Sequence, residues 1–455
     1  MGSTRAVAPP AAAGFARARA RPERFVWGGD GVGSWVAPAG ALADEVPNAP
    51  ADRPNFLRGH PYLPRSGDSA GGDVYDDRVH RLLATLLLVP LIGCSSESSP
   101  GPTPEPPNEF AAFDDAVEAH LQAHELSGAT AVIATEDEGI VHLRAYGDFT
   151  VDRVTLLASA SKIVSVGVLM HLHDEGVLDI DAPIRTYLGD AGGPKGDITV
   201  AQLLSNSSGL VGLLPDPTFA PYLCQFIDAG TLEECAEAIY TTTEDAADLA
   251  PPDTEFRYGG AQWQLAGGVA EAASGMSWAE LVETIYVEPC GLDDSGYTNH
   301  FIKTVGQADA FAYPEFFDGD LTALDPTDNP NVEGGMYATI SDYAELLVMH
   351  LRGGTCGDHR VLSEASVERM QEDRVAEVYD GTTTLDPTMP GYGLGWWMTR
   401  PNTILSDTGA YGASPWMDVT RRYAAMLLME GKAEQGALFR VEATPIIEEI
   451  LDARP

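Results

Sequence analysis

The stretch LLASASKIVSVGVLMHL, residues 156–172, is apolar almost throughout and yet contains a lysine, Lys162. The whole chain has only four lysines, Lys162 among them. Residues three apart on the first turn of a helix share a face, so Ser159 and Lys162 are expected to bring their side chains together. Desolvation favours the neutral amine of a buried lysine, and a neutral amine can accept a serine proton. The S-x-x-K pattern in this apolar setting therefore predicts a serine nucleophile assisted by a lysine.

The charge of the chain argues against one class of partner. The formal net charge is −41, whereas nucleic-acid-binding surfaces need clustered Lys and Arg to contact phosphates. We therefore expect no nucleic-acid partner, and we interpret the acidity as a solvated surface. The 455 residues, 44% of them hydrophobic, are enough to bury a large core.

The N-terminal part of the chain has the features of a targeting region. Residues 1–78 are rich in Ala, Pro, Gly and Arg without a helical or strand period, so we expect them to be disordered or absent from the native protein. Residues 79–94 look like a lipoprotein signal peptide, with an apolar run too short to span a bilayer and a final Cys94 as the lipidated residue. Residues 95–109 read as a flexible linker. These features predict a lipid-anchored protein of the cell envelope, periplasmic or associated with the outer membrane; the alternative is a core helix at 82–92.

Four cysteines remain beyond Cys94, and an even number is typical of disulfides in an exported protein. We favour the pairs Cys224–Cys235 and Cys290–Cys356, because the first two are close in sequence. The alternative is four reduced, buried thiols. The spacing of the cysteines does not match a zinc site, and HLHDE at 171–175 does not match the metal-binding pattern of metallo-β-lactamases, so we expect no metal.

The order of the periodic segments predicts the fold class. Apolar spacing at 110–126 indicates a helix, and β-rich runs at 130–134 and 140–146 flank a hairpin turn. Residues 181–342 read as helical segments broken by loops. Strand patterns return near the C-terminus, followed by a closing helix at 438–451; the expected strands are 394–399, 403–407, 413–418 and 424–430. We therefore predict a mixed α/β domain over 110–455, with one sheet built from both ends and a mainly helical insertion.

Several segments, in chain order, resemble the serine β-lactamases and penicillin-binding proteins, especially the class C β-lactamase, esterase and DD-peptidase group. The resemblance begins at SASKIVSVGVLMHLHDEGVLDIDAPIRTYL and covers about Phe110 to Leu451. It implies the β-lactamase/transpeptidase-like fold with an antiparallel sheet. The further matching segments are ITVAQLLSNSSGL (198–210), FRYGGAQWQLAGGVAEAASGMSW (256–278), GGMYATISDYAELLVMHLRGG (334–354), GYGLGWW (391–397) and SDTGAYGASPWMDVTRRYAAMLLME (406–430).

The resemblance assigns roles to matching residues. It implies that Ser159 is the acylated nucleophile and that Lys162 assists its deprotonation. Tyr258 matches the tyrosine that shuttles protons, with a phenol pKa lowered by the nearby lysine; the alternative is an ordinary core tyrosine. The backbone N–H groups of Ser159 and Ala410 match the oxyanion hole. The resemblance implies no cofactor.

The sequence departs from the family at two substrate-binding positions. Gly260 stands where the family has an asparagine that positions the substrate amide, so this contact is missing unless Gln262 replaces it. In Asp407-Thr408-Gly409 an aspartate stands where the family has the cation that meets the substrate carboxylate. We expect Asp407 to repel that carboxylate and not to help lower the pKa of Tyr258.

These residues together predict an exported serine hydrolase that forms an acyl-enzyme. A small-molecule ester, or an amide without the carboxylate, fits the electrostatics better than a β-lactam. One alternative is a DD-peptidase or β-lactamase acting on peptidoglycan peptides or β-lactams. The other is a non-catalytic envelope protein that keeps the fold for binding. We expect a monomer.

Overall fold

The computed structural model describes residues 108–213, 219–307, 309, 311–379, 381, 383 and 386–454. The predicted signal segment with Cys94, and most of the predicted linker, lie outside the described residues. Among the helices of the described ranges, none is long and apolar enough to cross a membrane.

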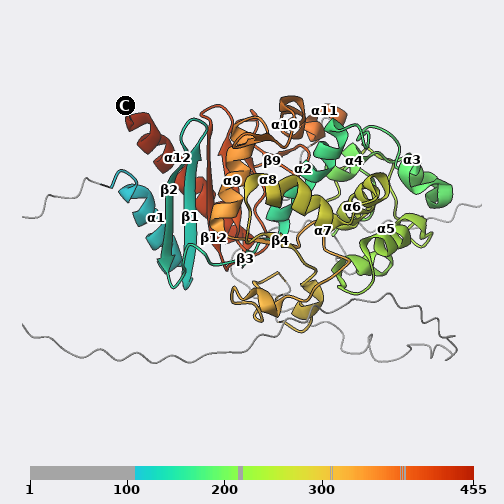
Figure 1. Cartoon of the computed structure of the whole chain (residues 1–455), viewed down its shortest axis with the longest axis horizontal. Coiled ribbons are helices and arrows are strands. Elements are labelled where there is room, and N and C mark those ends of the chain that lie inside the picture. The colour runs from blue at the N-terminus through green and yellow to red at the C-terminus, as the bar shows by residue number, and fades with distance from the viewer. Residues whose placement is uncertain are drawn as a thin grey trace, which may run out of the picture.

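The two ends of the described chain meet in one antiparallel sheet of seven strands, in the order β2-β1-β12-β11-β10-β9-β8 (Figure 1). Strand β1 pairs on one side with β2 and on the other with β12, where Ala129 lies opposite Met429. This pairing confirms the prediction of a sheet built from both ends. The strands of this sheet are β1 (Gly128–Thr135), β2 (Gly139–Gly147), β8 (Gly391–Tyr392), β9 (Trp397–Met398), β10 (Ile404–Ser406), β11 (Ser414–Asp418) and β12 (Tyr423–Met429).

Both faces of this sheet are covered by helices, because alternate residues of its central strands join two separate apolar clusters. Ala131 and Ile133 pack with Phe113 of α1 and Phe439 of α12, while Val132 joins the cluster of α2 and α9. Figure 1 shows α1 and α12 on the outer side of the sheet and α9 on the inner side. The helices of these two layers are α1 (Ala111–Ala123), α2 (Ser161–Asp174), α9 (Ile340–Leu351) and α12 (Ala433–Ala453).

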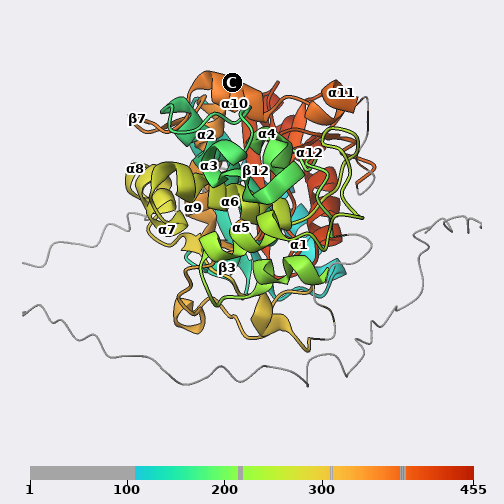
Figure 2. The ribbon, with the colours of Figure 1, turned by 90° about the vertical axis from the view of Figure 1, so that its right-hand side faces the viewer.

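The middle of the chain forms the predicted helical insertion, which shares one apolar cluster with α2 and has α3 to α6 turned towards the viewer in Figure 2. A second sheet has three strands in the order β3-β5-β4. Its strands are β3 (Thr155–Leu156), β4 (Gly296–Tyr297) and β5 (Met336–Ala338), and β6 (Thr355–Cys356) pairs with β7 (His359–Arg360). The remaining helices are α3 (Arg185–Leu188), α4 (Val200–Leu204), α5 (Leu232–Thr241), α6 (Ala261–Ser274), α7 (Trp278–Val282), α8 (Glu288–Cys290), α10 (Glu364–Met370) and α11 (Arg374–Tyr379).

Several predicted boundaries differ from the structure, and two of the differences lie near the serine turn. Ser159 does not open the α-helix: it lies in a 3-10 turn, Ala158–Ala160, and α2 begins at Ser161. The predicted strand at 394–399 is reduced to β9, because the chain at Gly395 turns with a φ of 77° to pass against α2. The turn before α2 matters for the site, since it sets the direction of the Ser159 side chain.

Both favoured cysteine pairs are disulfides, Cys224–Cys235 and Cys290–Cys356, so the prediction of the pairing is confirmed. The first closes a sequence separation of 11 residues within the helical insertion. The second closes a separation of 66 residues and ties α8 to β6.

We expect the double variant Cys290→Ser/Cys356→Ser to be destabilised more than Cys224→Ser/Cys235→Ser. Loop-closure entropy gives about 4 kcal/mol for the longer loop and about 3 kcal/mol for the shorter one. Urea unfolding of the two variants measures the difference, and each pair contains one buried cysteine, so the burial is matched. An equal or larger loss for the shorter loop would contradict this prediction.

Candidate active site

Ser159 lies on a turn that neighbouring segments hold in place. The preceding residue, Ala158, has a φ of 47°, in a region that residues with a side chain rarely adopt. The Ser161 hydroxyl donates to the Ala158 carbonyl at 2.6 Å and accepts the backbone N–H of Met336 at 3.0 Å. The turn is therefore fixed both to its own helix and to β5, and it presents a half-buried serine at the junction of the sheet and the helices.

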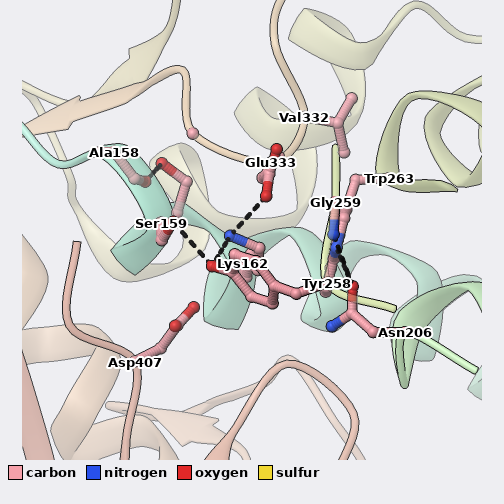
Figure 3. A network of polar contacts seen from close by, with 12 residues as sticks. Ala158, Ser159, Lys162, Asn206, Tyr258, Gly259, Trp263, Val332, Glu333 and Asp407 are labelled. Carbon is pink, nitrogen blue, oxygen red and sulfur yellow. Dashed lines mark hydrogen bonds and ion pairs between the residues drawn. The ribbon is translucent and has the colours of Figure 1, made fainter. Parts of the chain in front are cut away.

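Tyr258 links the predicted nucleophile to the predicted lysine (Figure 3). The Tyr258 hydroxyl donates to Ser159 Oγ at 2.9 Å, and Lys162 Nζ donates to the Tyr258 hydroxyl at 2.6 Å. Tyr258 precedes α6, and Lys162 lies in the first turn of α2 with no exposed surface. The structure thus links the three residues by hydrogen bonds, with the Tyr258 hydroxyl between Lys162 Nζ and Ser159 Oγ.

Glu333 extends this line and was missed by the sequence analysis. Its Oε1 lies 3.2 Å from Lys162 Nζ, and the two side chains are 9% and 0% exposed. A buried amine and a buried carboxylate each need a counter-charge, and they supply it to one another. The signal available in the sequence was a single acid, Glu333, directly before the glycine pair of the segment at 334–354.

The environment of Tyr258 raises the pKa of its phenol well above the ordinary value. Burial is the main cause, the charges of Asp407 and Glu333 add to it, and the hydrogen bond with Ser159 opposes it. The prediction of a lowered pKa is therefore wrong, because burial and two carboxyls raise it. The phenol keeps its proton, so Tyr258 fits the role of a proton relay better than that of a standing base.

Asp407 is fully buried, and the sequence analysis misjudged its charge. The Trp397 indole N–H donates to Asp407 Oδ1 at 3.1 Å. Burial, with a smaller contribution from Glu333, raises the pKa of Asp407 to about 8, while Lys162 and the bond from Trp397 act in the opposite direction. Near neutral pH the carboxyl is therefore mostly protonated. The expected repulsion of a substrate carboxylate therefore does not hold there.

The segment after Asp407 comes close to the serine turn. A Cβ on Gly409 would lie 2.0 Å from the Leu157 carbonyl oxygen, so only glycine permits this approach. The half-buried Ala410 follows it, next to the turn that contains Ser159. The Thr408 hydroxyl lies 3.0 Å from the Ser414 hydroxyl. The segment of Gly409 and Ala410 therefore runs beside the serine turn, and the role of the Ala410 N–H in an oxyanion hole stays a prediction.

Gln262 does not replace the asparagine that is missing at Gly260. Its side chain is buried, and its Nε2 donates to Asn206 Oδ1 at 2.6 Å and to the Arg257 carbonyl at 2.8 Å. Its Oε1 accepts the Ser208 hydroxyl at 2.6 Å. Because these partners use the amide, Gln262 holds the segment before α6 in place instead of contacting a substrate. Asn206 accordingly has a structural role, because its side chain holds the buried Gln262.

The comparisons with known proteins point to one family. The family model described as Beta-lactamase matches residues 113–443. Penicillin-binding protein 4 of Amycolatopsis lactamdurans is 25% identical over 311 residues, which are 64% of this chain and 76% of that protein. Esterase EstB of Burkholderia gladioli is 28% identical over 228 residues, 46% of this chain and 54% of that protein.

A solved structure shows the same fold. The crystal structure of a putative beta-lactamase from Bacteroides dorei DSM 17855 has a TM-score of 0.59 and 23% identity, and the match covers 74% of this chain and 98% of that one. The family model spans well over half of the sequence, and the site residues come from segments that it includes. On these grounds the chain belongs to the beta-lactamase family, with penicillin-binding proteins and esterases among its relatives.

Proposed function

We propose that this protein is an exported serine hydrolase that forms an acyl-enzyme on Ser159 and cleaves esters, or amides without the recognition carboxylate. One observation carries the proposal: the Tyr258 hydroxyl lies within hydrogen-bond distance of both Ser159 Oγ and Lys162 Nζ. This contact joins a nucleophile to a proton acceptor, which is what nucleophilic catalysis by serine requires.

The reaction follows from this line of side chains. Ser159 Oγ attacks the substrate carbonyl carbon, and its proton passes to Tyr258 while the phenol proton moves toward Lys162. The N–H groups of Ser159 and Ala410 stabilise the negative oxygen of the tetrahedral intermediate. When the intermediate collapses, the relay returns a proton to the leaving alcohol. Water then hydrolyses the acyl-serine by the same route in reverse order.

The substrate class follows from what the site lacks. Asp407 supplies no positive charge for a substrate carboxylate, and Gly260 supplies no side chain for a substrate amide. An ester needs neither contact. The second candidate is a DD-peptidase or β-lactamase, which the penicillin-binding relative favours. Protonation of Asp407 removes the repulsion of such a substrate but offers it no attraction.

We also propose that the protein is anchored to the cell envelope by a lipid on Cys94. The proposal rests on the apolar run that ends at Leu-Ile-Gly-Cys and on the following segment rich in Ser and Pro. A lipid anchor of this kind would hold the folded hydrolase outside the cytoplasm, where its two disulfides are stable.

Replacement of the nucleophile tests the first proposal. Ser159→Ala should lower kcat/KM for p-nitrophenyl acetate by at least about 1,000-fold, because the acyl-enzyme can no longer form. The wild-type protein should hydrolyse this ester faster than nitrocefin. Ser274→Ala is the matched control, since the Ser274 hydroxyl contacts only backbone groups near its own helix end. Unchanged turnover in Ser159→Ala would refute the assignment.

A fluorophosphonate probe separates the enzyme from a binding protein that keeps the fold. The probe should add to Ser159, as peptide mass spectrometry of the wild-type protein would detect. Absence of any adduct, together with absent turnover of both substrates, would instead support the non-catalytic alternative.

The buried carboxyl predicts a pH-dependent stability. The pKa of Asp407 rises from 3.8 to about 8 in the fold, so the unfolded chain binds fewer protons between these values. The stability that the protonated form contributes is complete below about pH 4 and is lost as the pH rises to about 8. The Tm of Asp407→Asn minus that of the wild type should therefore increase from pH 4 to pH 8 and then stay constant. A difference that does not change with pH would contradict this protonation state.

Lipidation is tested by Cys94→Ser in a bacterial host. The wild-type protein should partition into the detergent phase of Triton X-114 and carry a diacylglyceryl mass on Cys94, whereas the variant should remain aqueous. A wild-type protein that stays in the aqueous phase and retains peptides from residues 1–78 would rule out the anchor.

A further inference from the structure

Lys162 must release a proton before it can accept one from Tyr258. Its Nζ lies 2.6 Å from the Tyr258 hydroxyl, and the usual form of a lysine side chain is an ammonium group with three protons. An ammonium group has no lone pair, so the proton that leaves Ser159 has no destination while Lys162 holds three of its own. The relay needs a group beyond Lys162.

Glu333 is placed to be that group. Its Oε1 lies 3.2 Å from Lys162 Nζ, is buried, and has no hydrogen-bond partner of standard geometry among the described residues. The carboxylate therefore has a free lone pair beside the amine. Figure 3 shows Ser159, Tyr258, Lys162 and Glu333 joined in that order by two hydrogen bonds and an ion pair.

We propose that Glu333 is the terminal proton acceptor of the relay. This inference rests on the proposed acyl-enzyme chemistry. As the bond from Ser159 Oγ to the carbonyl carbon forms, the serine proton moves to Tyr258, the phenol proton moves to Lys162, and one ammonium proton moves to Glu333. The leaving alcohol receives its proton by the reverse transfers, which restore the ammonium and the carboxylate. Glu333 acts through Lys162 and does not touch the substrate.

Gly260 provides the space that Glu333 occupies. A Cβ built on Gly260 would lie 2.2 Å from Glu333 Oε2 and 2.1 Å from Gln225 Oε1. Both atoms are the ends of side chains, so a small residue at 260 would displace them without breaking the backbone. The departure from the family asparagine and the presence of Glu333 are therefore two parts of one arrangement: a side chain at position 260 and a carboxylate beside Lys162 compete for the same volume.

Three other ionisable groups interact electrostatically with Glu333. They are Lys162 on α2, Tyr258 before α6, and Asp407 after β10. Tyr258 keeps its proton over the working range, whereas Asp407 titrates near pH 8. The pH profile of kcat is therefore best measured in an Asp407→Asn background, which removes the carboxyl that titrates near pH 8.

The decisive experiment is the pH profile of kcat for p-nitrophenyl acetate with and without Glu333→Gln. Without the terminal acceptor, activity needs a Lys162 that has already lost a proton to solvent. We expect kcat near pH 7 to fall about 100-fold with little change in KM, and the acid limb of the profile to move to higher pH. Glu333→Asp, which keeps the carboxylate, should retain the position of the limb. Asp325→Asn is the control, because Asp325 pairs with Lys303 at the surface.

A second variant displaces Glu333 without removing it. Gly260→Ala should reproduce the shift of the acid limb, and Gly260→Ala/Glu333→Gln should be no worse than either single variant, since both act on one interaction. Thermal unfolding of each variant verifies that the fold is retained. If Glu333→Gln does not fold, Gly260→Ala alone decides the question.

A shift of the acid limb to lower pH, or no shift, would overturn the inference. If Glu333 were only a counter-charge, its removal would let Lys162 lose a proton more readily, and the limb would move to lower pH or stay in place with kcat unchanged. This failure is distinct from failure of the proposed function. If only the inference about Glu333 fails, the parent protein still reacts with a fluorophosphonate at Ser159. If the proposed function fails, it does not.

Discussion

The burial of the Lys162 amine is the constraint on which the site depends. An ammonium group without exposed surface is costly unless charges and hydrogen-bond acceptors surround it. Here three partners meet that need: the Tyr258 hydroxyl at 2.6 Å, the Glu333 carboxylate at 3.2 Å, and the Tyr258 ring, whose centroid lies 4.6 Å away. Because these partners come from separate segments, the chain can satisfy the lysine only when the turn before α2, the approach to α6 and the loop before β5 are assembled together. Folding and preorganisation of the site are therefore one event.

The architecture serves this assembly. The large sheet joins both ends of the described chain, and its strand β10 leads directly to Asp407 and Gly409 beside the serine turn. The helical insertion supplies Tyr258 and the segment of Glu333 from the other side. Two glycines make the close contacts possible, Gly409 against the Leu157 carbonyl and Gly260 beside Glu333. The site thus lies where two parts of the fold meet, and small residues at that junction are as necessary as the reactive ones.

The sequence predicted well what depends on local pattern and less well what depends on burial. Ser159 and Lys162 followed from their spacing in an apolar helix, and the pairing of both chain ends followed from the position of the strand patterns. Glu333 was missed because an isolated acid before a glycine pair gives no local sign that it will face a lysine 171 positions earlier in the chain, given their numbers 333 and 162. The charge of Asp407 was misjudged for a related reason, since only the packing of Trp397 and the neighbouring core shows that the carboxyl is buried.

Tyr258 and Lys162 are proposed to take the proton of Ser159 as its Oγ attacks a carbonyl carbon, and the whole account depends on this step. Rapid mixing with p-nitrophenyl acetate, followed by acid quenching and peptide mass spectrometry, tests it most directly. The account predicts that an acetyl group appears on Ser159 within the first turnover and that its amount matches an initial release of p-nitrophenol. Release of p-nitrophenol at the full rate without acetylation of Ser159, or with acetylation of another residue in the site, would contradict it.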